Sequence, residues 1–375
     1  MNCAVARSIY YYTDSRELGG AEISLLMLLE GLDRGRWTPT LLLDDDPGAD
    51  LLAERATGAG AAVKRVAPMP LGLAGARRAV GLARLLRRER PAVFHAHMSW
   101  PLAGKWPLAA AVASRAPSVG TVQLIPEFEL ERSSYWQLRA LARGVGRYAA
   151  VSRDIAAELA ERFHWPPDKI EVVYNAVRLE RFEAPAPAGL REELARGRPL
   201  VLTCARLDEQ KGHDVLLRAA TGLPGVAFAF AGEGPLRAEL EALVTELGLG
   251  DRVRFLGRRD DVPALLAACD VFALPSLYEG SSLAVLEAMA GRRAVVSSAI
   301  GGTEELIEDG RSGLLVPPGD SEALREALGR ALGDAELRET LARAARERVE
   351  RDFTPEAMVG ANERIYGELL GDGRA

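Results

Sequence analysis

The sequence is poor in the residues that build disulfide frameworks and metal centres. Its 375 residues include three cysteines and four histidines. Cys3, Cys204 and Cys269 lie far apart and form no C-x-x-C pair, so we expect ordinary buried thiols in a reducing compartment. Three aspartates at 44–46 have no histidine or cysteine beside them. We interpret them as the solvated turn after a strand and reject a metal site there.

The chain also lacks long apolar runs and an excess of positive charge. The chain contains no run of about 18 apolar residues, the length that is needed to span a bilayer. Residues 1–12 lack the apolar stretch after a basic start that is typical of a signal peptide. A formal net charge of −6 argues against a general nucleic-acid binder. We therefore expect a soluble, cytoplasmic protein whose partners do not include nucleic acid.

Short apolar runs alternate with helical patterns along most of the chain. The run at 270–275 is nearly continuous, as in a strand that is covered on both faces, and a second buried strand is expected at 200–205. Further strands are expected at 37–43 and 118–125. Such alternation of strands and helices predicts the α/β class with parallel, doubly wound sheets.

The length allows two domains of ordinary size. A stretch at 183–199 that is rich in proline, alanine and charged residues predicts the linker between them. We therefore assign residues 1–182 to a first domain and 200–353 to a second. Residues 354–375 are expected to form a final helix.

The most informative stretch covers residues 274–318 and reads LPSLYEGSSLAVLEAMAGRRAVVSSAIGGTEELIEDGRSGLLVPP. A buried strand leads to a turn at Glu279-Gly280 and to a helix for which Ser282 is the expected N-cap. Free backbone NH groups and the helix dipole favour phosphate in such a loop. Glu279 and Glu287 could bind hydroxyl groups on either side of it. The alternative is a surface helix with two solvated glutamates.

A second loop supplies positive charge. After the apolar run at 200–205 the chain reads Arg206-Leu-Asp-Glu-Gln-Lys211-Gly212 and enters a helix. One arginine and one lysine in such a loop suit a diphosphate, because they neutralise the charge that grows on a leaving group.

These two loops resemble those of the retaining glycosyltransferases of family 4, which have the GT-B fold. The matching motifs are two glutamates with seven residues between them, followed by GGTEELIEDGRSGLLV, together with R-L-x-x-x-K-G at 206–212 and G-E-G-P at 232–235. The resemblance covers nearly the whole chain and is most specific from 200 to 320. It implies two facing Rossmann-like domains around a cleft, with the C-terminal helix crossing back to pack on the N-terminal domain.

The resemblance also assigns roles in the second domain, which would bind the nucleotide sugar. Glu279 would orient the donor sugar and Glu287 would bind the ribose hydroxyls. Arg206 and Lys211 would bind the diphosphate and assist its departure without a metal. Further donor-binding residues would be Gly232, Gly280, Ser281, Ser282, Leu283 and Arg258, the last of these near the nucleobase.

The first domain would supply the acceptor side. The resemblance places a glycine pair such as Gly19-Gly20 beside the acceptor, with a plain turn as the alternative. His97 ends a strand in a His-x-His pattern; it is either a residue of the site or a hydrogen-bonded structural histidine. Gln123 stands where many relatives have histidine and can bind a sugar hydroxyl but cannot carry a proton. Glu127 lies in an acidic, aromatic segment that suits a sugar or an amine-bearing acceptor. The alternative is an ordinary exposed loop.

Residues 73–90 predict a basic amphipathic helix. Val80, Ala83 and Leu86 are expected to face inward and six arginines largely outward. Such a helix can lie on anionic lipid, so we expect either peripheral contact with the inner membrane face or a solvated outer helix.

We predict a retaining hexosyltransferase that needs no cofactor. It would move a hexose or N-acetylhexosamine from a nucleoside diphosphate sugar, by default a UDP-sugar, to a hydroxyl group. The acceptor would be a glycan, a lipid-linked sugar or a small metabolite. Sugar phosphorylase, nucleotide-sugar epimerase and a non-catalytic subunit that binds nucleotide sugar are the alternatives. The complete set of Arg206, Lys211, Glu279 and Glu287 argues against the last of these.

Overall fold

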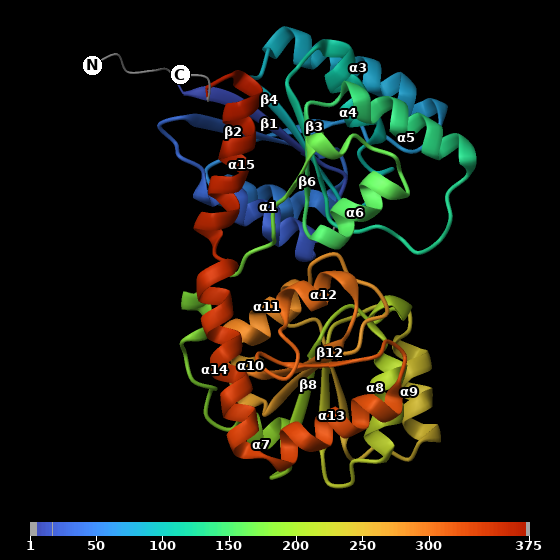
Figure 1. The fold of residues 1–375 in the computed structure, drawn as a ribbon, viewed down its shortest axis with the longest axis vertical. Coiled ribbons are helices and arrows are strands. Elements are labelled where there is room, and N and C mark those ends of the chain that lie inside the picture. Colours follow the sequence, from blue (N-terminus) through green and yellow to red (C-terminus); the bar gives the residue numbers. More distant parts are fainter. Residues whose placement is uncertain (1–5, 17, 373–375) are drawn as a thin grey trace. The chain divides into compact units, whose positions relative to one another are not determined.

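The computed structural model describes residues 6–16 and 18–372. The chain divides into unit 1, which comprises Met1–Ala176 with Pro355–Ala375, and unit 2, which comprises Val177–Thr354. Each unit is built around a parallel sheet that is covered by helices on both faces (Figure 1). The predicted α/β class with two doubly wound sheets is confirmed.

The sheet of unit 1 has seven strands in the order β3-β2-β1-β4-β5-β6-β7. The strands are β1 (Arg7–Thr13), β2 (Trp37–Asp44), β3 (Ala62–Val66), β4 (Val93–Met98), β5 (Ser118–Val122), β6 (Arg147–Ala150) and β7 (Ile170–Val172). The helices are α1 (Gly20–Gly31), α2 (Asp50–Gly58), α3 (Leu73–Glu89), α4 (Lys105–Ser114), α5 (Arg132–Gly144), α6 (Arg153–Glu161) and α15 (Pro355–Leu370). Every pair of neighbouring strands in this sheet is parallel.

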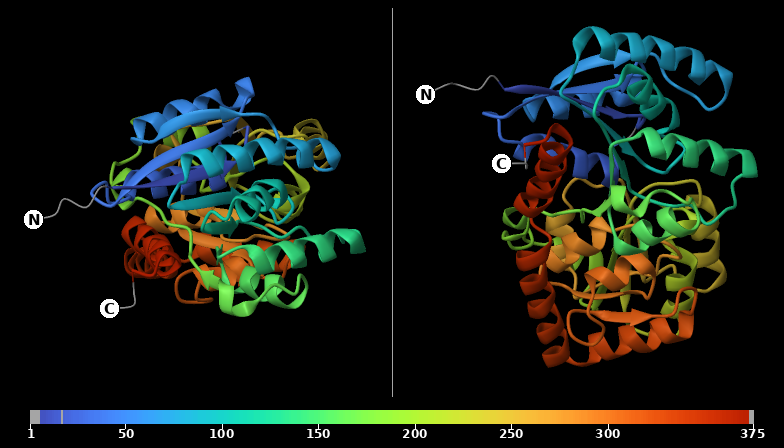
Figure 2. Two further views of the ribbon diagram at one scale, coloured as in Figure 1. Left: turned by 90° about the horizontal axis from the view of Figure 1, so that it is seen from above. Right: turned by 45° about the horizontal axis from the view of Figure 1, so that its top comes forward.

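Helix α15 belongs to unit 1 although it follows the whole of unit 2 in sequence. It lies beside α1 (Figure 1; Figure 2). Its fully buried Tyr366 hydroxyl is 2.7 Å from His95 Nδ1 and 3.1 Å from the Tyr11 hydroxyl. The other ring nitrogen of His95 is 2.7 Å from Thr121 Oγ1. These contacts fix the helix to β1 and β4, and they make His95 a structural residue.

The sheet of unit 2 has six strands in the order β10-β9-β8-β11-β12-β13, again all parallel. The strands are β8 (Leu200–Cys204), β9 (Ala227–Ala231), β10 (Val253–Gly257), β11 (Val271–Leu274), β12 (Ala294–Ser298) and β13 (Leu314–Val316). The helices are α7 (Leu190–Ala195), α8 (His213–Thr221), α9 (Arg237–Glu246), α10 (Val262–Ala268), α11 (Leu283–Ala290), α12 (Gly301–Leu306), α13 (Ser321–Gly333) and α14 (Ala335–Asp352). Strands β8, β9, β11 and β12 are buried along their whole length, as their apolar sequences predict.

Some local features differ from the sequence-based expectations. Val80 is half exposed rather than buried, because α3 turns Gly75, Ala79, Leu82, Ala83 and Leu86 toward the core. Strand β3 lies at the edge of the sheet, and the sequence did not indicate it. Its residues, AVKRV, do not alternate clearly between apolar and polar side chains. The proline-rich stretch 183–199 lies within unit 2 and contains α7.

The cysteines of the described residues are buried and free. Both Cys204 and Cys269 are in the core of unit 2. Burial raises the pKa of the Cys269 thiol to about 12 and also raises that of Cys204. They are therefore inert thiols at neutral pH, as expected. Cys3 lies outside the described residues.

Candidate functional site

In both sheets the direction of winding reverses beside the first strand, between β1 and β4 in unit 1 and between β8 and β11 in unit 2. Loops that leave the carboxyl ends of strands at such a reversal diverge to opposite faces and leave room for a ligand. In unit 2 the two loops at this point contain residues 205–212 and 275–282. These are the two segments that the sequence singled out.

A part-buried ion pair joins the two loops of unit 2. Lys211 Nζ is 2.5 Å from Glu279 Oε1, and the two side chains are 18% and 7% exposed. Ser276 donates a further hydrogen bond of 2.8 Å to the same carboxylate oxygen. Gln210 binds the opposite loop twice, through its side chain to the Tyr278 carbonyl and through its own carbonyl to the Leu277 NH. The lysine and the glutamate are therefore held in place before any ligand arrives.

Two glycines allow the backbone segments of this site to approach one another closely. Gly212 has a φ of +61°, and a Cβ atom there would lie 2.1 Å from the Pro275 carbonyl oxygen. A Cβ atom on Gly302, at the start of α12, would lie 1.8 Å from the Gly280 carbonyl oxygen. Both distances are far too short for a side chain, so glycine is required at each position.

Helix α11 begins directly after the loop. Its N-cap is Ser282, whose Oγ accepts a hydrogen bond of 3.5 Å from the Val285 NH; the predicted cap is confirmed. Gly280, Ser281 and Ser282 are buried, and Leu283 is half-buried. The NH groups at the start of such a helix and its dipole favour an anion. They lie next to the Lys211–Glu279 pair in the chain and in the fold.

Glu287 lies on the same helix, with its side chain 15% exposed. Burial raises the pKa of this carboxyl group to about 7, and the Arg181 guanidinium group opposes the shift. Arg181 Nη1 lies 3.9 Å from Glu287 Oε1. Sequence reasoning missed Arg181, because a single arginine in a 3₁₀ turn before the first helix of unit 2 carries no pattern.

The remaining donor-side candidates lie around the end of β8. Arg206 is 63% exposed, and its Nε donates to Asp208 at 2.5 Å. Its carbonyl oxygen is 2.9 Å from His213 Nε2. Gly232 has a φ of +152°, and a Cβ atom there would lie 1.9 Å from the Ala205 carbonyl oxygen. Arg258 is exposed directly after β10.

The corresponding edge of unit 1 holds a buried chain of neutral side chains. Gln123 Nε2 lies 2.9 Å from His97 Nε2, and Asn175 donates to Gln123 Oε1 at 3.0 Å. Ser24 in turn donates to Asn175 Oδ1 at 2.7 Å. Since Gln123 Oε1 is the acceptor, its Nε2 must donate to His97, which leaves the histidine proton on Nδ1. Burial lowers the pKa of His97 to about 4, with partial opposition from the Ala21 backbone, so the ring is neutral near pH 7.

The other acceptor-side candidates are more exposed. Gly19 and Gly20 are exposed at the start of α1, and the Gly19 NH donates to Glu22 Oε2 at 2.9 Å. Burial raises the pKa of Glu22. Glu127 is exposed in the segment before α5. Among residues 6–16 and 18–372, no hydrogen bond or ion pair connects Glu127 to Gln123 or His97.

Within the described residues, no group of three or more histidine, cysteine or acidic side chains is arranged to hold a metal ion. None of the helices in that part of the chain has the length and apolar character needed to cross a bilayer.

Comparison with known families gives two matches that together cover most of the chain. Residues 190–348 match the model described as "Glycosyl transferases group 1". Residues 18–181 match the model described as "Glycosyltransferase Family 4". The division between the two matches falls close to the beginning of unit 2.

Two curated relatives are similar in sequence. The chain is 37% identical over 172 residues to the lipopolysaccharide core biosynthesis glycosyltransferase LpsE of Rhizobium meliloti, covering 46% of this chain and 49% of that protein. It is 36% identical over 251 residues to a D-inositol 3-phosphate glycosyltransferase of Salinispora tropica, covering 61% of this chain and 52% of that one. The chain thus spans about half the length of the curated relatives it matches.

Among solved structures, the chain is similar to Anabaena Alr3699/HepE in complex with UDP and glucose. The TM-score is 0.85 at 23% identity, over 96% of this chain and 100% of that one. At this identity the likeness shows the fold alone. The two family matches together show that the chain belongs to the group 1, family 4 glycosyltransferases, and the structural likeness shows that it has the GT-B fold.

Proposed function

We propose that the protein is a retaining glycosyltransferase that uses a nucleoside diphosphate sugar as its donor. It transfers a hexose or N-acetylhexosamine to a hydroxyl group without a metal ion. The observation that carries the proposal is the Lys211–Glu279 ion pair, which joins the two loops at the reversal point of unit 2 next to the start of α11. A cation, a carboxylate and a helix N-terminus together suit a diphosphate that is attached to a sugar.

In this proposal the diphosphate binds between the start of α11 and the two cations. The NH groups of Gly280, Ser281, Ser282 and Leu283 face its oxygens. Glu279 compensates the charge of Lys211 and holds the lysine in position before the donor adds its own charge. Arg206 is mostly exposed and is therefore free to swing from Asp208 toward the phosphates.

Glu279 and Glu287 bind the two sugars of the donor. Glu279 accepts hydrogen bonds from the transferred sugar while it stays bonded to Ser276 and Lys211. Glu287 accepts from the ribose hydroxyls, a role that requires its ionised form. Arg181 supports that form, because its guanidinium group counteracts the rise in the Glu287 pKa. Gly232 and Arg258 contribute at the nucleobase end.

The chemical step breaks the bond between the anomeric carbon and the phosphate oxygen. Its electron pair leaves with the nucleoside diphosphate, whose growing charge is stabilised by Arg206, Lys211 and the α11 dipole. The acceptor oxygen attacks the short-lived oxocarbenium ion on the same face, and its proton passes to the departing phosphate oxygen. The anomeric configuration of the product, compared with that of the donor by NMR, tests this step. Inversion would refute it.

The acceptor side belongs to unit 1 in this proposal. Gly19, Gly20 and Glu127 are exposed and can contact an acceptor directly, whereas Gln123 and His97 are buried and hold the edge in shape. The relatives named above act on lipopolysaccharide core and on D-inositol 3-phosphate by their names, so glycan, lipid-linked and small acceptors all fit. A lipid-linked acceptor would suit peripheral contact of α3 with the inner membrane face. UDP is the preferred nucleotide of the donor because Anabaena HepE was solved with UDP.

The test is nucleoside diphosphate release from UDP-, GDP-, ADP- and dTDP-sugars in EDTA, with thermal shift recorded in parallel. One donor that stabilises the protein and releases its diphosphate without metal would support the proposal. Glu279→Gln should retain the thermal shift and lose release, whereas Lys211→Ala should lose both. If none of the four donors released its diphosphate or shifted the melting temperature, the proposal would be contradicted.

A further inference from the structure

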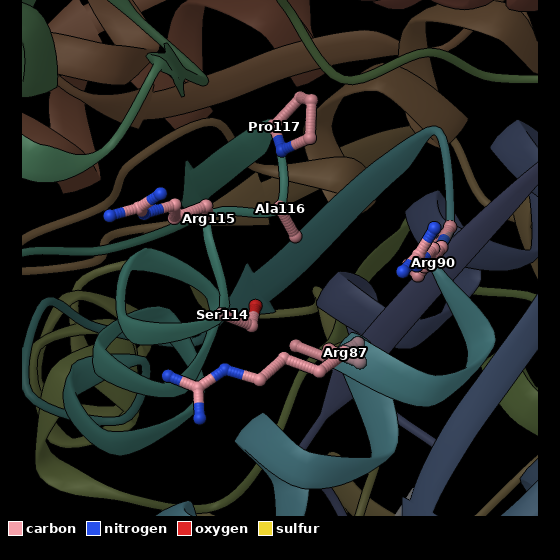
Figure 3. Close-up of a pocket in the computed structure, with 8 residues that line it drawn as sticks. Arg87, Arg90, Ser114, Arg115, Ala116 and Pro117 are labelled. Atoms are coloured by element: carbon pink, nitrogen blue, oxygen red, sulfur yellow. The ribbon is translucent and has the colours of Figure 1, made fainter.

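A basic cavity lies at the edge of the unit 1 sheet opposite to His97 and Gln123. It has a volume of about 490 Å³ and lies between the last turns of α3 and α4 (Figure 3). This volume falls within the range of roughly 300–1,000 Å³ that is usual for small-molecule pockets. Three arginines, Arg87, Arg90 and Arg115, line it.

The fold explains why these arginines come together. Helices α3 and α4 pack against each other and lead into the neighbouring parallel strands β4 and β5, so both end at the amino edge of the sheet. Arg90 follows α3 with a φ of +48°, and Arg115 follows α4 with a φ of +64°. Arg87 Nη2 donates to the Ala113 carbonyl oxygen at 2.7 Å and ties the two helix ends together.

The positive side chains of the cavity are not matched by acidic side chains. Over the described ranges, none of the three guanidinium groups forms an ion pair, and no acidic residue lines the cavity. Glu89 is the sole acid of α3, and its carboxylate binds Lys64, Tyr10 and Arg88 instead. Like charges around one cavity repel each other, and an anion between them relieves that repulsion.

Arginine at the end of a helix is not by itself a sign of binding, because cations are generally favourable at helix C-termini. Arg196 after α7 and Arg292 after α11 also have positive φ values, of 50° and 55°. What distinguishes Arg90 and Arg115 is that two such helix ends meet around one cavity, with Arg87 beside them.

We propose that this cavity binds a phosphate-type oxyanion. Guanidinium groups bind phosphate oxygens with paired hydrogen bonds. Arg87, Arg90 and Arg115 extend in different directions (Figure 3), and all three are exposed, so their flexible side chains can turn toward an anion that binds between the two helix ends. The anion can be free in solution or belong to the headgroup of an anionic lipid. Because the cavity lies at the amino edge of the sheet, its ligand is distinct from the donor and the acceptor of the proposed transfer.

The first arm of the test is calorimetric titration with inorganic pyrophosphate at low ionic strength. Wild type is compared with Arg90→Gln/Arg115→Gln and with Arg196→Gln/Arg292→Gln. The control pair has the same charge change and the same backbone conformation in unit 2. Each lost phosphate contact should weaken binding at the cavity by about tenfold or more in the first variant only. Any binding at the donor site is common to all three proteins and cancels in the comparison.

The second arm uses sedimentation with phosphatidylglycerol-containing vesicles against phosphatidylcholine vesicles. Loss of vesicle binding in the cavity variant alone assigns the lipid headgroup as the source of the anion. Loss of pyrophosphate binding, with no vesicle binding by any form, assigns the free anion. Unchanged binding in both arms, or an equal loss in the control pair, overturns the proposal.

A second variant guards against a folding defect. Ser114→Glu keeps all three arginines and adds a carboxylate to the lining of the cavity (Figure 3). Its far-UV circular dichroism and melting temperature should match those of wild type, and its anion binding should fall as in the double variant. Retention of wild-type anion binding by Ser114→Glu would also overturn the proposal.

Discussion

The two sheets share a winding pattern, but their carboxyl edges carry different chemistry. At the reversal point of unit 2 a lysine and a glutamate form a part-buried ion pair next to a helix N-terminus. At the matching edge of unit 1, Ser24, His97, Gln123 and Asn175 form a chain of neutral hydrogen bonds. The same topology thus supports an ion pair at the reversal point of one unit and a chain of neutral hydrogen bonds at that of the other.

This difference follows from what each edge would bind. A diphosphate brings negative charge that must be matched by cations, and its departure increases that charge. The reacting hydroxyl group of an acceptor brings no charge and needs positioned polar groups. Changes in unit 2 should therefore alter donor binding, whereas changes in unit 1 should leave it intact.

The largest effect is expected from Lys211→Ala. The substitution removes a part-buried cation from the proposed diphosphate site, so turnover should fall by roughly 10²–10³-fold, as for loss of one transition-state contact. Initial rates of diphosphate release measure it, at a temperature below the melting transition, since Glu279 is left buried with Ser276 as its remaining side-chain partner. Lys105→Ala in unit 1 is the control for loss of a lysine. An equal loss of rate in Lys211→Ala and Lys105→Ala would show that the loss does not come from the proposed diphosphate site.

The next effect concerns backbone packing and is expected from Gly302→Ala. Its Cβ atom would lie 1.8 Å from the Gly280 carbonyl oxygen and would displace the loop that carries Glu279. Donor affinity should fall by about tenfold or more, with a lower melting temperature, because overpacking costs roughly 1–3 kcal/mol. Gly333→Ala has open space around its Cβ position, so it should leave the donor affinity unchanged and should not lower the melting temperature. Wild-type donor affinity in Gly302→Ala would show that the loop has no part in binding.

The charged edge of unit 2 could be predicted from the sequence because its chemistry is local. Arg206, Lys211 and Gly212 lie within one loop, and Glu279, Gly280 and the N-cap lie within another, so each segment carries its own pattern. What the pattern could not give is the distance between the loops. The ion pair depends on β8 and β11 being neighbours, and 68 residues separate its two members.

The hydrogen-bond chain of unit 1 could not be predicted, although His97 and Gln123 were candidates, because its members are scattered along the sequence. Gln123 binds His97, 26 residues before it, and Asn175, 52 residues after it. The contact between Ser24 and Asn175 spans 151 residues. Single polar residues in otherwise apolar segments carry no signal of such pairing until the sheet order is known. The contact between Arg181 and Glu287 escaped prediction for the same reason.

A third prediction separates stability from binding at Glu287. Its pKa is raised from 4.5 to about 7 in the folded protein. The folded state therefore binds more protons than the unfolded state between these values, and stability falls as pH rises through this window. Above pH 7 the buried carboxylate should cost about 3 kcal/mol, and Glu287→Gln removes that cost.

The melting temperature of Glu287→Gln should thus exceed that of wild type at about pH 8, and the gap should shrink at about pH 5. Donor affinity should change in the opposite way. It should rise with pH through about 7 in wild type, as the carboxylate forms, and stay low in the variant. Glu322→Gln, on the exposed first turn of α13, is the control. A melting difference that does not depend on pH would exclude a raised pKa at Glu287.

The smallest effect on the reaction is expected in unit 1, from Gln123→Leu. The substitution leaves the buried His97 Nε2 and Asn175 Nδ2 without the partner they share, and each unpaired group costs about 1–3 kcal/mol. The melting temperature should fall, and the rate with acceptor should drop a few fold because the edge of the sheet is less well held. The KM for the donor should stay at the wild-type value, since no charge of the diphosphate site has changed. Gln137→Leu, at an exposed position of α5, tests the loss of a glutamine alone. If the KM for the donor rose in Gln123→Leu as much as in Lys211→Ala, both sheets would take part in donor binding. The ion pair of unit 2 and the neutral chain of unit 1 would then not have separate roles.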